Sequence, residues 1–177
     1  MKKIAVFGSG NGSNFEAIAE YFQDRNDIKF VCISDKKDAF ILERAKRLGI
    51  ENYYVPFTNT LDFLKKNDFY LVVLAGYMRI LPKEIVEYIK IINIHPSLLP
   101  DFKGMDAIKQ AYEAGVEVTG VTVHYIDEGV DTGPVIAQVP VSIQVGMSLE
   151  QLEESVHKAE HQLYPQVIDH LLFNKIF

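Results

Sequence analysis

The sequence has little cysteine, no long apolar run and no excess of positive charge. Its single cysteine, Cys32, lies in an apolar stretch and cannot form a disulfide within the chain. We therefore expect a cytoplasmic protein. No apolar run approaches the length of a bilayer span, so no membrane association is expected. The net charge of −6 argues against a large nucleic-acid surface.

The apolar residues that follow Met1 to Lys3 could be mistaken for a secretory signal. Glycines interrupt them after four residues, which is too early for the apolar core of a signal peptide. With 177 residues, 48% of them hydrophobic and 24% charged, the composition is that of an ordinary globular protein. A single domain is the simplest expectation, because the chain contains no repeats, linkers or low-complexity tracts.

Apolar segments alternate with helical patterns through the first hundred residues. The segments with strand character are 3–7, 28–34, 53–55, 69–75 and 91–95. The segments with helical spacing are 15–22, 40–48, 61–66 and the turns after Pro82, with Asn59 and Thr60 as capping candidates for the third. This alternation predicts an α/β fold with a doubly wound, mostly parallel sheet, right-handed crossovers and helices on both faces.

After the first hundred residues the regular alternation of strand and helix patterns ends. A helix is expected at 107–114, followed by strands at 118–125 and 135–143 that an acidic, glycine-containing loop separates. A long helix begins near Leu149, where Ser148 and Gln151 have the spacing of a capping box. Pro165 should kink or interrupt that helix.

The strand at 91–95 carries two polar residues in an isoleucine-rich setting. Asn93 and His95 are two positions apart, so they share one face while Ile92 and Ile94 share the other. A buried amide and imidazole need hydrogen-bond partners. One interpretation is a core histidine whose bonds are satisfied. The other, which the rest of the chain favours, is a catalytic pair facing a cleft at the carboxyl edge of the sheet.

The glycine-rich stretch 8–14 lies between a strand and a helix, where backbone N–H groups can bind an anion. It is not a Walker loop, and it misses a dinucleotide fingerprint because Ser13 stands at the third glycine position. Asp35, at the end of the second strand, could act as the ribose-binding acid, so a dehydrogenase stays open. Ser13 and Asn14 suit a terminal monophosphate; the alternative is a tight turn that needs small residues.

The acidic loop 126–134 lacks the regular ligand spacing of a calcium site. It is either a solvated hairpin turn or a source of one carboxylate that reaches the face of Asn93 and His95, where it would orient the ring and favour its charged form.

His157, Glu160 and His161 spell the inverted zinc-protease motif on the last helix. A third ligand is missing, so we expect one polar helix face or part of a ligand pocket, and no metal.

Several motifs in order along the chain carry a family resemblance. They are Gly12-Ser13-Asn14, Leu74–Leu81, Asn93–Pro100, Lys103-Gly104, Gly120–His124 and Asp131–Pro134. With them the chain resembles the folate-dependent formyl transferases, and among these the glycinamide ribonucleotide formyltransferase family of de novo purine synthesis. The resemblance covers nearly the whole chain.

The resemblance implies a Rossmann-like formyltransferase fold and assigns roles to individual residues. The implied catalytic residues are Asn93, His95 and Asp131. The implied ribonucleotide and phosphate contacts are Gly12, Ser13, Asn14, His157 and Glu160. The implied folate contacts are Met78, Arg79, Ile80, Leu81, Asn93, Asp127, Glu128, Gly129, Val130 and Asp131. Relatives have a cis peptide at the position of Leu99–Pro100, and the sequence leaves open whether this chain does.

The implied reaction moves a formyl group from the co-substrate 10-formyltetrahydrofolate to glycinamide ribonucleotide, without a metal. The implied organisation is one domain with a nucleotide-binding half, 1–100, and a folate-site and C-terminal helix half, 101–177, as a monomer or homodimer. Two positions depart from the family: 58–60 lack an arginine that often touches the folate, and His157 replaces a usual glutamine. Both departures bear on peripheral contacts.

Related activities fit less well. A methionyl-tRNA formyltransferase would need a basic surface and an added domain, which the length and acidity exclude. A formyltetrahydrofolate hydrolase usually has an additional N-terminal domain. A non-catalytic nucleotide-binding module would leave Asn93 and His95 without a role.

Overall fold

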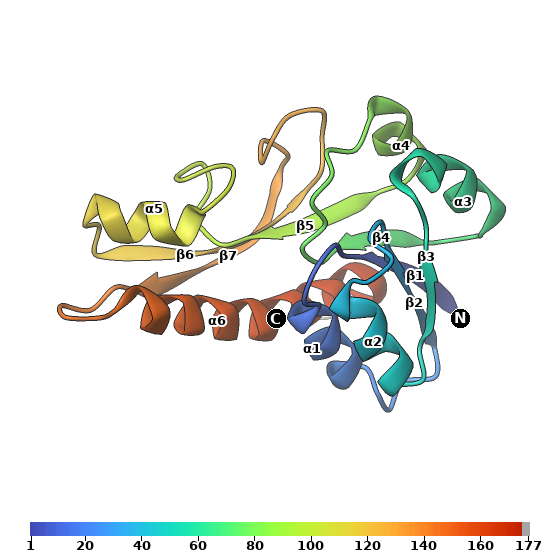
Figure 1. Ribbon diagram of the computed structural model, residues 1–177, viewed down its shortest axis with the longest axis horizontal. Helices are drawn as coiled ribbons and strands as arrows, with labels where there is room; N and C mark the ends of the chain where they lie inside the picture. Colours follow the sequence, from blue (N-terminus) through green and yellow to red (C-terminus); the bar gives the residue numbers. More distant parts are fainter. Residues whose placement is uncertain (175–177) are drawn as a thin grey trace. The chain divides into compact units, whose positions relative to one another are not determined.

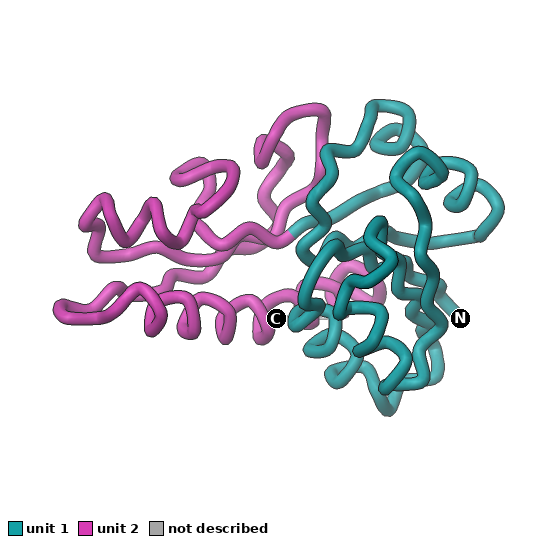
Figure 2. The backbone as a smooth tube through the Cα atoms, in the orientation of Figure 1, with its two compact units in different colours: residues 1–93 teal, residues 94–177 magenta. Residues whose placement is uncertain are grey.

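The computed structural model describes residues 1–174, which fall into two compact units (Figure 2). Unit 1 is Met1–Asn93, and unit 2 begins at Ile94. The predicted division of one domain at residue 100 stays a prediction. Among the described residues, no helix is long and apolar enough to cross a membrane.

Seven strands form one sheet in the order β3-β2-β1-β4-β5-β6-β7. They are β1 Lys2–Phe7, β2 Ile28–Ser34, β3 Glu51–Tyr54, β4 Leu71–Leu74, β5 Ile91–His95, β6 Val118–Tyr125 and β7 Val135–Ser142. The first five pair in parallel, and β6 pairs with β7 antiparallel. The predicted mostly parallel sheet is confirmed.

The described helices are α1 Ser13–Tyr21, α2 Phe40–Arg47, α3 Thr60–Lys66, α4 Lys83–Tyr88, α5 Ala107–Ala114 and α6 Leu149–Phe173, with a short 3₁₀ turn, η1 Phe57–Asn59. Strands β2 and β3 are added on one side of β1, and β4 and β5 are added on the other side. Right-handed crossovers therefore place α1 and α2 on one face of the unit 1 strands and α3 and α4 on the other. Figure 1 shows these two pairs on opposite sides. Strands covered on both faces must be apolar throughout, and every residue of β4 is buried.

The buried cysteine of the core stays in its thiol form, which is not nucleophilic. Cys32 lies in β2 with no exposed surface. Burial raises the pKa of its thiol to about 12, so the thiol stays protonated at neutral pH.

Three local predictions need correction. Asn59 does not cap α3; η1 precedes the helix instead, and the Thr60 hydroxyl donates to the Phe57 carbonyl at 2.8 Å. Pro82 stands one residue before α4 rather than inside its first turn. α6 runs through Pro165 without interruption, and the buried proline ring adds to the apolar face that holds the helix. The capping box of Ser148 and Gln151 is confirmed. The Leu99–Pro100 peptide, which the sequence left open, is cis.

Candidate active site

His95, at the end of β5, is held between a carbonyl and a carboxylate. Its ring is 5% exposed, with Nε2 2.9 Å from the Phe102 carbonyl oxygen and Nδ1 3.5 Å from Asp131 Oδ2. A carbonyl oxygen only accepts, so Nε2 must carry a hydrogen. Nδ1 is therefore the ring nitrogen that faces the carboxylate.

Asp131 lies in the loop between β6 and β7 and reaches toward His95. Its backbone has φ of 54°, the left-handed region that non-glycine residues rarely adopt. Oδ2 accepts the Gly104 N–H at 2.9 Å, and Oδ1 lies 3.7 Å from His124 Nε2. Of the two interpretations of the acidic loop, the structure therefore supports a carboxylate directed at the histidine.

The acidic loop is shaped by its own first carboxylate. Asp127 Oδ1 accepts the Thr132 hydroxyl at 2.6 Å and the Gly129 N–H at 2.9 Å. These hydrogen bonds, the Thr132 hydroxyl first, hold the pKa of Asp127 below its usual value. A Cβ at Gly133 would lie 1.7 Å from the Tyr125 carbonyl oxygen, so only glycine fits there. Asp127 thus stabilises the turn that presents Asp131.

His124 is a neighbour of this site that the sequence reasoning did not single out. It is fully buried on β6, and its Nδ1–H donates to the Tyr125 carbonyl oxygen at 3.0 Å. Burial is the main cause that lowers the pKa of His124, so this ring is neutral at neutral pH. The hydrogen bond to Tyr125 and the charge of Asp131 oppose this lowering of the pKa of His124 without outweighing it.

The loop after β5 positions the carbonyl that contacts His95. Thr122 on β6 donates its hydroxyl to the Ser97 carbonyl at 2.7 Å and accepts the Leu99 N–H at 3.1 Å. Gln138 on β7 donates to both the Leu99 carbonyl and the Thr122 hydroxyl at 2.9 Å. These bonds hold the backbone that leads to Phe102.

The glycine-rich loop places two polar residues at a helix start. Ser13 and Asn14 are the first two residues of α1, and Gly12 before them has φ of 80° with no side-chain cap. A Cβ on Gly12 would lie 2.6 Å from Ile41 Cγ1, so this position needs glycine for its backbone and for space. The predicted strand-to-helix anion site has the expected local geometry.

Asp35 does not have the free carboxylate that a ribose contact requires. Its Oδ1 accepts the Ser9 hydroxyl at 2.6 Å, and its Oδ2 accepts Arg79 Nε at 2.9 Å. Burial raises the pKa of Asp35, but the hydrogen bonds from Ser9 and Arg79 outweigh it, and the net pKa is lowered. Because the Asp35 side chain has no exposed surface and both of its oxygens already accept hydrogen bonds, the dehydrogenase alternative loses its ribose-binding acid.

The same cluster fixes the loop after β4. The Met78 N–H donates to the Ser9 hydroxyl at 2.9 Å, and the Arg79 guanidinium lies over the Phe57 ring at 5.3 Å. Of the predicted folate contacts in this loop, Met78 and Ile80 have exposed side chains, whereas Leu81 is buried. Leu81 could therefore offer a ligand little beyond its backbone.

The last helix pairs two of its predicted site residues. His157 Nδ1 lies 3.1 Å from Glu160 Oε2, with His157 half exposed and Glu160 buried. The hydrogen bond that His157 donates to the Glu160 carboxylate raises the pKa of His157. Within residues 1–174, no three histidine, cysteine or acidic side chains are grouped to hold a metal ion.

The His157–Glu160 pair makes a testable contribution to pH dependence. Since the folded-state pKa of His157 lies above its unfolded value, the pair stabilises the fold fully below about pH 6.5 and less as pH rises through the folded-state pKa. We expect His157→Gln to lower the free energy of unfolding at pH 6 and to match the parent at pH 9. Denaturant titrations across that range test this, and a pH-independent difference would contradict it.

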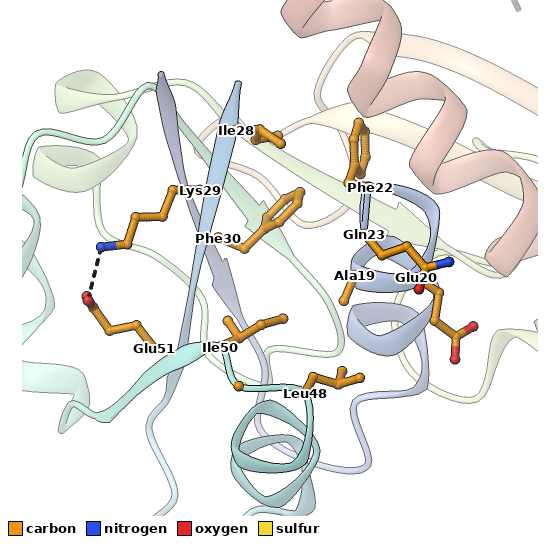
Figure 3. A pocket seen from close by; sticks show the side chains of 11 residues that line it. Ala19, Glu20, Phe22, Gln23, Ile28, Lys29, Phe30, Leu48, Ile50 and Glu51 are labelled. Carbon is orange, nitrogen blue, oxygen red and sulfur yellow. Dashed lines mark hydrogen bonds and ion pairs between the residues drawn. The ribbon is translucent and has the colours of Figure 1, made fainter. Parts of the chain in front are cut away.

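A separate cavity in unit 1 contains none of the predicted site residues (Figure 3). It has a volume of about 390 Å³ and is lined by the end of α1, the start of β2 and the turn into β3. Phe22 and Phe30 face it, and the Lys29–Glu51 ion pair, 3.1 Å, lies at its edge. The cavity is at the amino ends of the parallel strands, whereas Gly12 and Asp35 follow carboxyl ends.

A doubly wound sheet, an acid–histidine pair after one strand and a glycine-rich helix start after another are features of an α/β enzyme. The chain belongs to the formyl transferase family, whose model matches residues 2–168. It is 46% identical over 186 residues to the phosphoribosylglycinamide formyltransferase of Bacillus subtilis (strain 168), covering 97% of this chain and 95% of the relative.

Solved structures agree with this assignment. Glycinamide ribonucleotide transformylase 1 from Geobacillus kaustophilus is 45% identical, with a TM-score of 0.90 over 97% of this chain and 99% of that one. Phosphoribosylglycinamide formyltransferase from Anaplasma phagocytophilum is 38% identical, with a TM-score of 0.93 over 99% of this chain and 89% of that one. The family resemblance predicted from the motifs is confirmed.

Proposed function

We propose that this protein transfers the formyl group of 10-formyltetrahydrofolate to the amino group of N1-(5-phosphoribosyl)glycinamide in de novo purine synthesis. Curated relatives 40% and 46% identical over nearly the whole chain bear the name of that enzyme. The observation that carries the proposal is the 3.5 Å contact of His95 Nδ1 with Asp131 Oδ2 beside a strand that also bears Asn93.

In the proposed reaction the substrate amine attacks the formyl carbon and a new C–N bond forms. The formyl oxygen becomes the oxyanion of a tetrahedral intermediate, and the bond to N10 of the folate then breaks. The amine loses a proton, and N10 of the departing tetrahydrofolate gains one. The oxyanion is the charge that the protein has to stabilise, because no covalent intermediate with a side chain is required.

Asn93 and protonated His95 are the proposed donors to the oxyanion. The Nε2–H of His95 is engaged by the Phe102 carbonyl, so its Nδ1–H is the donor directed toward the carboxylate side of the site. A neutral ring with hydrogen on Nε2 would have no donor there. The reaction therefore depends on the imidazolium form of His95.

Asp131 has two proposed roles. Its carboxylate stabilises the imidazolium, and it receives the amine proton, through a water molecule, for return to N10. The Gly104 N–H and the left-handed backbone at Asp131 keep the carboxylate oriented toward the ring.

The ribonucleotide is proposed to bind Gly12, Ser13 and Asn14 through its phosphate, with His157 and Glu160 as further contacts. The folate is proposed to bind Met78, Arg79, Ile80 and Leu81 and the loop from Asp127 to Asp131. Support comes from the α1 N-terminus and from the hydrogen bonds that fix both folate loops. A cytoplasmic location and a monomeric or homodimeric state belong to the proposal as well.

The phosphate assignment predicts a selective effect of Asn14→Ala. Hydrogen bonds to a charged group contribute about 1.5–3 kcal/mol, so we expect KM for the ribonucleotide to rise roughly 10- to 100-fold with little change in KM for the folate. Asn59→Ala, an exposed asparagine in η1, is the matched control. Steady-state kinetics with each substrate varied in turn test this, and an equal rise in both KM values would refute the assignment.

A direct assay tests the function as a whole. Tetrahydrofolate release and formylated ribonucleotide are measured with and without the ribonucleotide. We expect release to require the ribonucleotide and to match the formylated product one to one. Tetrahydrofolate release at the same rate without the ribonucleotide would identify a formyltetrahydrofolate hydrolase. No release in the presence or absence of the ribonucleotide would favour a nucleotide-binding module.

A further inference from the structure

Arg44 on α2 makes several hydrogen bonds to the glycine-rich loop and the start of α1, and no sequence motif predicts them. Its Nε donates to the Asn11 carbonyl oxygen and its Nη2 to Asn11 Oδ1, both at 2.7 Å. Its Nη1 donates to Glu16 Oε2 in the first turn of α1. The Arg44 side chain is 16% exposed, and its guanidinium is a charged donor in all three bonds, which makes them stronger than bonds between neutral groups.

The loop depends on contacts of this kind because it has no cap of its own. Gly12, at the N-cap position of α1, offers no side chain to the helix start. The Ile41 N–H donates to the Gly10 carbonyl oxygen at 2.9 Å, and Ile41 packs against Gly12. Helix α2 therefore holds the loop backbone from one side, through Ile41 and Arg44.

Charge supplies a second reason. Glu16 lies in the first turn of α1, where its carboxylate would repel a phosphate bound at Ser13 and Asn14. The ion pair with Arg44 neutralises that carboxylate and directs it toward α2. Arg44 thus fixes the loop and removes an unfavourable negative charge from beside the anion site.

We propose that Arg44 is a positioning residue for the phosphate of the ribonucleotide, acting through Asn11 and Glu16. This inference rests on the proposed function, because the phosphate-binding role of Ser13 and Asn14 comes from it. A purely structural arginine would affect both substrates alike, whereas a positioning residue for phosphate affects only the substrate that carries one.

The test compares Arg44→Met with Arg47→Met. Arg47 lies on the same helix and over the same Phe40 ring as Arg44, at 5.3 Å and 4.9 Å respectively, but is exposed. We expect Arg44→Met to raise KM for the ribonucleotide about 10- to 100-fold, with kcat and KM for the folate near the parent values. Arg47→Met should match the parent.

A phosphate-free substrate sharpens the result. With glycinamide ribonucleoside, the parent and Arg44→Met should have similar kcat/KM, because the contact that Arg44 supports is missing from both reactions. Arg44→Lys keeps the charge but not the fork of donors, so its KM for the ribonucleotide should be intermediate. That variant also keeps the test decisive where Arg44→Met fails to fold.

Three outcomes would each overturn the inference. The first is an equal rise in KM for both substrates, and the second is a loss of the same size with the ribonucleoside. The third is that Arg44→Met and Arg44→Lys behave like Arg47→Met. Calorimetric binding of the ribonucleotide separates this failure from failure of the proposed function. A parent that binds the ribonucleotide without transferring formyl contradicts the function, and the ratio of dissociation constants for Arg44→Met and the parent still decides the role of Arg44.

Discussion

Replacing His95 with alanine is expected to lower kcat for formyl transfer by about 10²- to 10³-fold, the usual cost of losing one oxyanion donor. The KM values of both substrates should change little, because the donor acts on a charge that develops only in the transition state. The fold should survive, since Asp131 keeps its hydrogen bond from the Gly104 N–H at 2.9 Å. Single-turnover rates with both substrates saturating provide the measurement.

His95→Asn separates the charge of the ring from its hydrogen bond. An asparagine side chain can place an N–H near the position of Nδ1, but it stays neutral at all pH values. We expect a smaller loss than for His95→Ala and a rate that no longer rises with protonation of residue 95. If His95→Ala retained parental kcat, Asn93 or backbone groups would have to supply the whole oxyanion stabilisation.

The pair on β5 could be predicted from sequence because strand alternation is strict. Two positions separate Asn93 from His95, so any strand through them puts both on one face. The strand at 91–95 has the predicted bounds, and the short connections around it dictated a parallel sheet. Neither inference needed knowledge of distant contacts.

The partner of His95 could not be chosen from sequence in the same way. The acidic loop offers several carboxylates, and its shape depends on the Asp127 hydrogen bonds and on the close approach of Gly133 to Tyr125. Such loop geometry has no periodicity that a sequence pattern could reveal. Family resemblance selected Asp131, and the structure brings its carboxylate to the ring.

Contacts from neighbouring elements, which a sequence pattern does not reveal, decide the roles of Arg44 and Asp35. Arg44 looks like one more cation on the exposed side of an amphipathic helix, and only the tertiary structure brings it to Asn11. Asp35 has the position of a ribose-binding acid, yet Ser9 and Arg79 occupy both of its oxygens. In both cases the deciding partner is at least 26 residues away in sequence.

Asp131→Asn is expected to lower kcat/KM by at least about 10²-fold at neutral pH, within the range that acid–base groups supply. The carboxylate of Asp131 lies 3.5 Å from His95 Nδ1, where its negative charge would stabilise the imidazolium that the proposed reaction requires. Asparagine keeps the size of the side chain and can still accept the Gly104 N–H, but it carries no charge. The neighbouring His124 cannot take over the role of a charged imidazole, because burial lowers the pKa of this second ring and keeps it neutral.

The dependence of kcat/KM on pH distinguishes Asp131→Asn from His95→Ala. The proposed reaction uses the imidazolium form of His95, which lower pH favours in any histidine. Part of the lost activity of Asp131→Asn should therefore return as pH is lowered, whereas lowering pH should not restore His95→Ala. Asp101→Asn, a charge change at an exposed position of the preceding loop, is the control and should follow the parent profile. An Asp131→Asn variant with parental activity and an unshifted profile would reduce the acidic loop to a structural turn, and the proton of the amine would need another acceptor.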